Sequence, residues 1–556
     1  MSRKSVLVLL FVVIFVSLQH PGFQQNRVGA SDGYPVHNLN TGLNYTTIQE
    51  AINSSETLSG HTILVDAGIY DEFVYITKCL TLIGENKSTT IVNGHIFVWA
   101  NYSRVTQFTV QNGGIQVEDS HESTLSSNIL KNNYIGIAIY DSSGNILKNN
   151  AMSNNTYNFD INSWYSSDFF QDIDSSNTID EKPMSYLVNQ HNQQVPYDAG
   201  YVALVNSTEI EVKSLNLKNN GMGVLLVNCT RCTVENVTSN DMDGIDMRFS
   251  SSNTLTNNTF TSSNYGFFMM NSDGNSIVHN RIHTDQGDGF WLQNSKCNIL
   301  GYNIFSGFVG DGFFDGIWLS DGSNFNVITG NTVSSYYNAV SLLGSCNNTV
   351  YRNNFLVSHN QVCSNNFLDR DGEGNYYSTY VGVDSNKNGI GDSPYIVYES
   401  IDHYPLMGTF QSFNVSITPQ SSEEVDVISN FTISNLGLYE WLSTPNQYLQ
   451  AGQPFLRLVP VQEQNMTAGF CRMTLPNNIL NTSEYIVLIN MTPVIVNKLA
   501  MSNDTYTTLY FTFNSSALDG IIIVPEFPSF LVIPLFMVAM LLPIAIYERK
   551  HRTRAL

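Results

Sequence analysis

The chain has 556 residues, of which 13% are charged and 42% hydrophobic, and its formal net charge is −22. This length predicts two to four domains, unless one of them is an elongated repeat. Because affinity for nucleic acid depends largely on Lys and Arg, the excess of 47 acidic over 25 basic residues excludes nucleic acid as a partner and disfavours strongly anionic glycans.

The two ends of the chain predict a secreted protein held on a membrane. Arg3 and Lys4 precede an apolar run, and small residues follow at 28–30, so we expect residues 1–30 to be a signal peptide. An uncleaved N-terminal anchor is the alternative. Residues 530–547 contain no charge and a basic tail follows, which predicts a transmembrane helix over 528–547 and a cytoplasmic tail over 548–556. A buried core helix is the alternative there.

Seventeen Asn-X-Ser/Thr sequons, with X not Pro, agree with a location on the extracellular face of the cell membrane. We expect several of them, but not all, to carry glycan. They include Asn44, Asn86, Asn206, Asn257, Asn347, Asn430 and Asn503.

The middle of the chain repeats a small residue followed by alternating apolar residues. The alternation is strand periodicity, and short strands with turns about every 22 residues predict the coils of a parallel β-helix. An Asn or Asn-Asn usually follows the second apolar stretch of each coil, and we expect these side chains to form hydrogen-bonded ladders in the turns. The repeats begin at Gly223, Gly244, Gly266, Gly289, Gly316 and Ala339.

Residues 31–408 are predicted to form this β-helix, with a short helix near 45–54 covering the open end of its core. The segments that carry a family resemblance are 46–53, 62–70, 80–86, 178–180, 195–202, 375–395 and 403–407. Together they resemble secreted proteins of the pectin-lyase-like superfamily, including the NosD-type subgroup. The resemblance implies an all-β, right-handed parallel β-helix. It leaves the activity open, since the superfamily includes lyases, hydrolases, binding proteins and copper-related accessory proteins.

The repeat stops before Phe413, and residues 413–523 alternate apolar with polar between turn-forming clusters. This pattern predicts a small β-sandwich that acts as a stalk between the β-helix and the membrane. Residues 525–529 (PEFPS) resemble the PEF-type sorting signals of archaeal surface proteins, which implies cleavage of the tail. A permanent transmembrane helix is the alternative.

Outward residues of successive coils form columns, and one face collects aromatic and acidic side chains. Aromatic rings can stack on sugars while carboxylates accept hydroxyl protons, so we predict that this face binds a polysaccharide or surface glycan. The alternative is that the insertion at 302–312 or the stalk covers the aromatics and the aspartates only form turns. The predicted carbohydrate-binding residues are Tyr265, Phe268, Trp291, Trp318, Asp246 and Arg248.

The same face raises the alternative of a polysaccharide hydrolase or lyase. Glycosidases use two carboxyl groups about 5–5.5 Å or about 6.5–9.5 Å apart, and stacked coils bring Asp288, Asp315 and Asp243 near such spacings. The chain departs from polygalacturonases in lacking their Gly-His-Gly and Arg-Ile-Lys motifs, which puts hydrolysis in doubt. A third alternative is a purely structural surface scaffold.

One loop has the pattern of a structural calcium site. Asp384, Asn386, Asn388 and Asp392 place side-chain oxygens at alternate positions around a Gly, as calcium-binding loops do. A plain Asx/Gly turn is the alternative. Copper would need Met, His or Cys side chains clustered together, and the candidates near residues 242–283 are scattered over inward and outward positions.

Overall fold

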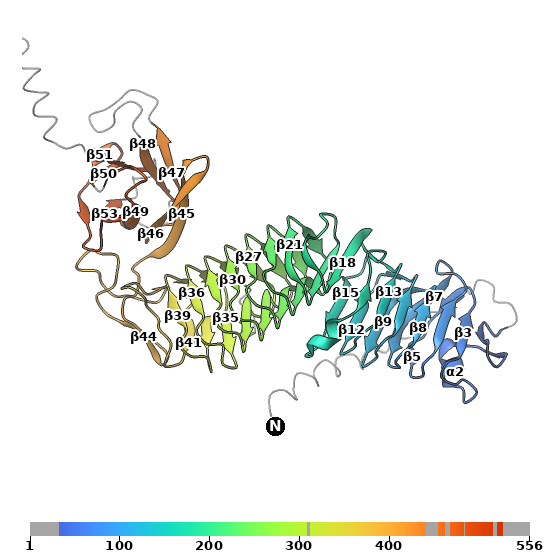
Figure 1. Ribbon diagram of the computed structural model, residues 1–556. Coiled ribbons are helices and arrows are strands. Elements are labelled where there is room, and N and C mark those ends of the chain that lie inside the picture. The colour runs from blue at the N-terminus through green and yellow to red at the C-terminus, as the bar shows by residue number, and fades with distance from the viewer. Residues whose placement is uncertain are drawn as a thin grey trace, which may run out of the picture. The chain divides into compact units, whose positions relative to one another are not determined.

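The computed structural model describes residues 33–307, 312–440, 454–461, 468–482, 484–514 and 520–525. The chain divides into two compact units, the first formed by residues up to 163 with 171–181, and the second by 164–170 with residues from 182 onward. Both contain stacked coils of short β-strands, so the predicted all-β parallel solenoid is confirmed (Figure 1). The predicted signal peptide, transmembrane helix and basic tail, and residues 526–529 of the sorting-like segment, lie outside the described residues.

The first unit begins with a short helix at the end of its core. In α2 (Ile48–Asn53) the side chain of Thr47 caps the Glu50 N–H, and Ile48, Ala51 and Ile52 are fully buried. The coils that follow pair mostly in parallel. One sheet contains β1 (Val36–Asn38), β2 (Leu43–Tyr45), β3 (Thr62–Val65), β6 (Thr81–Gly84), β8 (Arg104–Thr106), β10 (Thr124–Ser126), β13 (Ile146–Lys148) and β16 (Asp172–Ile173). The other strands are β4 (Gly68–Tyr70), β5 (Val74–Ile76), β7 (Thr90–Val98), β9 (Thr109–Glu118), β11 (Ile129–Lys131), β12 (Ile135–Tyr140), β14 (Ala151–Ser153), β15 (Tyr157–Asn162) and β17 (Thr178–Ile179).

The second unit contains a solenoid of three parallel sheets, to which each coil contributes one strand. Sheet 1 contains β18 (Lys182–Val188), β20 (Tyr201–Val205), β23 (Met222–Val227), β26 (Asp243–Arg248), β29 (Phe267–Met270), β32 (Phe290–Gln293), β35 (Asp315–Ser320), β38 (Asn338–Leu342) and β41 (His359–Val362). Sheet 2 contains β19 (His191–Gln194), β21 (Thr208–Lys213), β24 (Thr233–Glu235), β27 (Thr254–Thr256), β30 (Ser276–Val278), β33 (Ile299–Gly301), β36 (Val327–Thr329) and β39 (Thr349–Tyr351). Sheet 3 contains β22 (Asn216–Lys218), β25 (Thr238–Asp241), β28 (Thr259–Ser262), β31 (Arg281–Thr284), β34 (Ile304–Ser306), β37 (Thr332–Ser334), β40 (Asn354–Phe355) and β42 (Tyr376–Tyr377).

The repeated glycines mark a corner where successive coils approach too closely for a side chain. A Cβ on Gly244 would lie 2.2 Å from the carbonyl oxygen of Gly266, and one on Gly266 would lie 2.5 Å from that of Gly289. The alternating apolar residues after these glycines point inward and are fully buried, as Ile245, Phe267 and Phe290 are. The repeat therefore sets both the corner and the core of the coil.

The predicted Asn ladders are confirmed at two corners of the second solenoid. Asn253 donates from its backbone N–H and its Nδ2 to Oδ1 of Asn275, at 2.9 and 3.0 Å. Asn258 makes the same pair of bonds to Asn280. Since turn N–H groups lack a strand partner, each amide satisfies backbone and side-chain donors that would otherwise be buried and unpaired.

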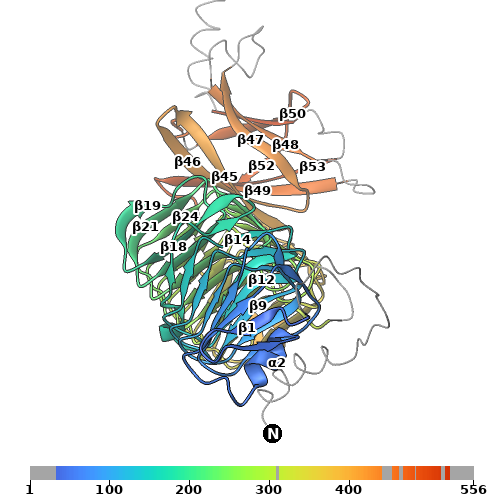
Figure 2. The same cartoon turned by 90° about the vertical axis from the view of Figure 1, so that its right-hand side faces the viewer.

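Residues 409–525 form two five-stranded antiparallel sheets, drawn in orange to red in Figure 2. Both sheets contribute buried side chains to a shared cluster that includes Val427, Leu458, Met473 and Phe511. One sheet contains β45 (Thr409–Thr418), β46 (Ser421–Ser429), β49 (Ala468–Pro476), β53 (Tyr506–Asn514) and β52 (Val496–Lys498). The other contains β47 (Ile433–Glu440), β48 (Pro454–Pro460), β54 (Ile521–Pro525), β50 (Tyr485–Ile489) and β51 (Thr492–Pro493). Within the described ranges, no helix has the length and apolar character needed to cross a membrane.

Ion pairs join these sheets to the last coils of the solenoid. Arg352 contacts Asp426 of β46 at 2.9 Å and also pairs with Glu373 at 2.5 Å. Arg472 of β49, only 1% exposed, pairs with the same Glu373. Glu373 lies in the 369–375 loop, so one buried carboxylate connects two arginines from different parts of the second unit.

Candidate functional site

The candidate site is the outward surface of sheet 1 from β26 to β38, and the structure brings its predicted aromatic residues together. Asp246, Phe268, Trp291, Trp318 and Ser341 occupy consecutive paired positions on five neighbouring strands. Strands in a sheet are about 4.8 Å apart, so each residue lies one strand spacing from the next. The columns expected from the repeat are therefore real columns on the folded surface.

Ring geometry limits what the aromatic column can offer to a ligand. The Trp291 and Trp318 rings stack with centroids 4.7 Å apart and an interplanar angle of 11°. Phe268 lies 4.9 Å and Tyr265 5.6 Å from the Trp291 ring, both tilted. Stacking uses one face of each indole, so a ligand meets ring edges and the face of Trp318 that points toward Ser341. Trp291 and Trp318 are partly exposed, whereas Phe268 is 7% exposed.

Asp246 and Arg248 differ from the exposed positions that the sequence predicts. They are 3% and 4% exposed and form an ion pair at 2.6 Å. The Arg248 guanidinium lies 5.4 Å from the centre of the Phe169 ring and 5.2 Å from that of Phe268. Phe169 belongs to the 3-10 helix η2 (Ser166–Phe169), so the segment 164–170 covers this end of the face. The sequence carries no signal for this long-range contact.

The predicted catalytic aspartates lie at or just before the start of sheet 1 strands and accept hydrogen bonds from the next coil. Oδ1 of Asp243 accepts the Tyr265 N–H at 3.1 Å, and Oδ1 of Asp288 accepts the Asp315 N–H at 2.7 Å. Oδ1 of Asp315 accepts Nδ2 of Asn338 at 2.6 Å. These carboxylates also bond between coils, but in the opposite direction from the Asn ladders, because an oxygen of one coil accepts from a polar group of the next.

Burial changes the acidity of two of these carboxyl groups. Burial raises the pKa of Asp288 to about 7, opposed by the hydrogen bond from the Asp315 N–H and reinforced by the Asp315 carboxylate. Burial likewise raises the pKa of Asp315 to about 6, opposed by hydrogen bonds from Asn338 and Ser341. At neutral pH this pair can therefore hold a proton, and the two residues are 7% and 8% exposed.

The loop at 384–392 is held by hydrogen bonds typical of a turn, so the structure does not support the predicted calcium site. The two carboxylate oxygens of Asp384 accept the N–H groups of Asn388 and Gly389, at 2.9 and 2.8 Å. Oδ2 of Asp392 accepts the Ser385 N–H, and Oδ1 of Asn388 accepts the Ile390 N–H. Asn386 directs its Nδ2, a donor, at Asp392. Four of the six side-chain oxygens in this set thus accept from the loop's own backbone.

A copper centre does not fit the donor set either. Met247 and Met269 are paired inside the apolar core, whereas His279 lies on an exposed corner stacked on Tyr302. Across the ranges that the structure describes, no group of three or more His, Cys, Asp or Glu side chains is placed to hold a metal ion.

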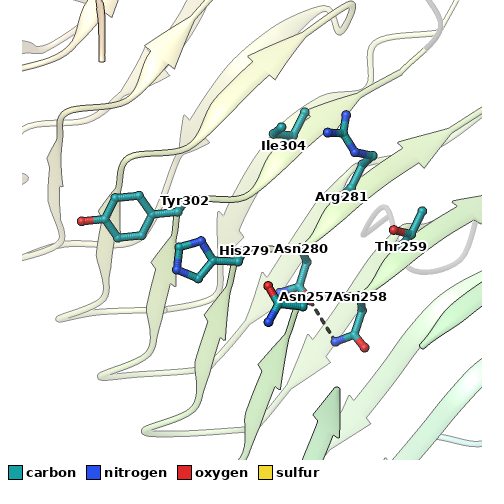
Figure 3. Close-up of a pocket in the computed structure, with 8 residues that line it drawn as sticks. All are labelled: Asn257, Asn258, Thr259, His279, Asn280, Arg281, Tyr302 and Ile304. Carbon is teal, nitrogen blue, oxygen red and sulfur yellow. Dashed lines mark hydrogen bonds between the residues drawn. The ribbon is translucent and has the colours of Figure 1, made fainter. Parts of the chain in front are cut away.

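Sequence reasoning missed a shallow groove of about 240 Å³ at the corner between sheets 2 and 3 (Figure 3). One wall carries Asn257, His279 and Tyr302, and the other carries Thr259, Arg281 and Ile304. Its floor is the Asn258–Asn280 ladder bond of 2.9 Å. The sequence does contain a signal for this groove. The residue immediately before each ladder Asn varies from coil to coil, as Asn257, His279 and Tyr302 do.

Comparison with known proteins agrees with this architecture. Residues 201–355 match the family described as right handed beta helix region, and residues 54–182 match the family described as periplasmic copper-binding protein (NosD). A cell surface glycoprotein of Methanothermus fervidus is 30% identical over 143 residues, which are 24% of this chain and 22% of that protein. The chain thus spans about a fifth of that relative's length.

Solved structures with a similar coil include the Siphovirus 9NA tailspike receptor binding domain, at 10% identity and a TM-score of 0.26, covering 84% of this chain and 97% of that one. Another is the mannuronan C-5 epimerase AlgE6 A-module of Azotobacter vinelandii, at 12% identity and a TM-score of 0.23, covering 56% and 95%. Superpositions this weak carry no argument about function. Residues 54–182 are thus similar to NosD-type proteins, and the match of residues 201–355 together with the stacked coils shows a right-handed parallel β-helix.

Proposed function

We propose that the protein binds an uncharged polysaccharide or surface glycan on the outward face of sheet 1. The observation that carries the proposal is the partly exposed Trp291–Trp318 stack in register with the Asp288–Asp315 pair one corner away. An indole face and edges can pack on the C–H surface of a sugar, and the small exposed part of Asp288 and Asp315, 7% and 8% of each residue, can exchange hydrogen bonds with its hydroxyls. A formal charge of −22 favours neutral over anionic chains.

An extracellular location belongs to the same proposal. The partial relative is named a cell surface glycoprotein and the NosD family is named periplasmic, and both names refer to places outside the cytoplasm. We propose that the two antiparallel sheets of residues 409–525 are a sandwich that acts as a stalk. Residues 528–547 would then anchor the protein, with the β-helix outside the cell.

A polysaccharide hydrolase or lyase is the second candidate, favoured by the raised pKa values of Asp288 and Asp315. A general acid needs a carboxyl that stays protonated near neutral pH. Against it, Oδ1 of each residue already accepts a hydrogen bond within the corner. Binding without turnover is therefore the function that the geometry supports better.

The test is a binding and turnover screen of the full chain against immobilised and soluble neutral hexasaccharides of glucose, mannose, galactose and N-acetylglucosamine. Losing a sugar–aromatic contact of about 1 kcal/mol weakens binding about fivefold, and we expect at least this loss from Trp318→Ala. The matched control is Trp99→Ala, which removes an exposed tryptophan of the first unit. This variant should bind as the wild type does.

The outcomes separate the candidates. Saturable binding that Trp318→Ala weakens, without new reducing or unsaturated ends, supports a binding protein. Release of such ends that disappears in Asp315→Asn supports the enzyme. Binding that is equally strong in Trp318→Ala, or no binding by the wild type to any of the four sugars, rejects this face as the glycan site.

A further inference from the structure

The corner between sheets 2 and 3 presents its residues in a fixed pattern. The first residue after four consecutive sheet 2 strands is left-handed, with φ of 54° at Asn236, 57° at Asn257, 58° at His279 and 55° at Tyr302. Strand pairing places these four residues in one column. The next residue is buried, as Asn258 and Asn280 are in the ladder, and the third begins a sheet 3 strand.

This pattern displays a glycosylation sequon without disturbing the fold. In the sequon Asn257-Asn258-Thr259, the first and third residues are exposed, whereas the ladder residue between them is 1% exposed. Asn tolerates the left-handed conformation better than other non-Gly residues, so the fold itself favours Asn here. The exposed amide of Asn257 nevertheless stands at the edge of the groove, with the sequon hydroxyl of Thr259 on the opposite wall.

The groove beside Asn257 has the surfaces that a sugar requires. His279 and Tyr302 stack with ring centroids 5.1 Å apart and an angle of 10°. Because Tyr302 occupies one face of the imidazole, the other face is directed along the column toward Asn257 (Figure 3). Arg281 and Thr259 supply a charged donor and a hydroxyl across the groove, both exposed.

We propose that Asn257 carries an N-linked glycan and that the groove seats its first sugar against the free face of His279. In the linking step, Nδ2 of Asn257 loses one proton and bonds to the anomeric carbon of an activated glycosyl phosphate donor. The phosphate leaves with the anomeric oxygen, and a glycosyltransferase of the cell catalyses the transfer. This modification concerns a different surface from the proposed polysaccharide-binding face of sheet 1, and it rests only on the extracellular location proposed above.

The neighbouring sequon at Asn236 provides the internal comparison. It occupies the same column one coil earlier, about 4.8 Å away, but Asn257 rather than an aromatic ring follows it in the column. A glycan on Asn236 would therefore have no ring to pack on, and two glycans one strand spacing apart would collide. We expect Asn257 to be occupied and the two sites not to be occupied on the same molecule.

The experiment is glycopeptide mass spectrometry of the full chain isolated from the surface of its own cells, followed by NMR of the histidine ring protons. The chain has 11 histidines, so the His279 signal can be assigned with His279→Gln. Glycan on Asn257, with a His279 shift that changes in Asn257→Gln but not in Asn236→Gln, supports the proposal. An unmodified Asn257 overturns it, as does a modified Asn257 whose removal leaves the His279 signal unmoved.

Discussion

Replacing Asp288 with Asn tests whether the corner carboxylates are held in a buried setting. The carboxyl has a pKa of about 7, against 3.8 for an ordinary Asp, and the main cause is burial. Each pKa unit corresponds to about 1.36 kcal/mol, so ionising this group costs the folded state up to about 4 kcal/mol. Because the pKa is raised on folding, the proton stabilises the native state below about pH 4, and this contribution is lost as pH rises through about 7.

Asp288→Asn should therefore match the wild type at pH 4, where both side chains are neutral and nearly isosteric. The Asn retains an Oδ1 to accept the Asp315 N–H. At pH 8 the variant should be more stable by several kcal/mol, with about 4 kcal/mol as the upper limit. The measurement is urea unfolding at pH 4, 6 and 8, followed by tryptophan fluorescence, to which the nearby Trp291 and Trp318 contribute.

Asp198→Asn is the matched control, since Asp198 is exposed and its replacement should leave the pH profile unchanged. Parallel profiles for Asp288→Asn and the wild type between pH 4 and 8 would refute the reasoning. They would mean that the carboxyl ionises in the folded state as easily as in the unfolded chain.

Three further predictions concern the solenoid and its junction. Asn280→Ala removes the ladder bonds on both sides of one coil and should lower the unfolding free energy by about 2–4 kcal/mol in urea titrations, at unchanged secondary structure by circular dichroism. Gly266→Ala places a methyl group 2.5 Å from a backbone oxygen of the next coil and should lower the melting temperature by several degrees, which calorimetry would detect. Arg472→Met leaves Glu373 with one arginine fewer in a buried position, at a cost of about 3–5 kcal/mol, and should speed proteolysis near residue 409 while the coils stay intact.

The coil itself is predictable from the sequence because one repeat unit specifies it. Which of two adjacent apolar residues faces the core is harder to predict. Ile299 and Leu300 are adjacent apolar residues, as are Val327 and Ile328, and the structure buries Leu300 and Ile328 and leaves Ile299 46% exposed. Adjacent apolar residues cannot be told apart by hydrophobicity. The ladder Asn resolves the choice, because the inward residue follows it by two positions, as Leu300 follows Asn298.

The candidate site is only partly predictable for a different reason. The column from Phe268 to Trp318 follows from the repeat, because residues at equivalent positions of successive coils lie side by side whatever their type. The burial of Arg248 depends on Phe169, which is 79 residues away in the chain and belongs to an insertion between coils. No periodic pattern encodes such a contact. The repeat pattern also does not predict ring orientation, and the stacking of Trp291 on Trp318 covers one face of each indole.

The Asn ladder has a consequence for how such a protein can change length. Asn253 and Asn275 are 22 residues apart and bond to each other as Asn275 bonds to Asn298. Each coil of this ladder therefore presents the same acceptor to the coil before it and the same donors to the coil after it. A gene duplication of one such segment would insert a coil whose two interfaces already exist. The solenoid can grow or shrink by whole coils while its ends, including the Glu373 junction, keep their own contacts.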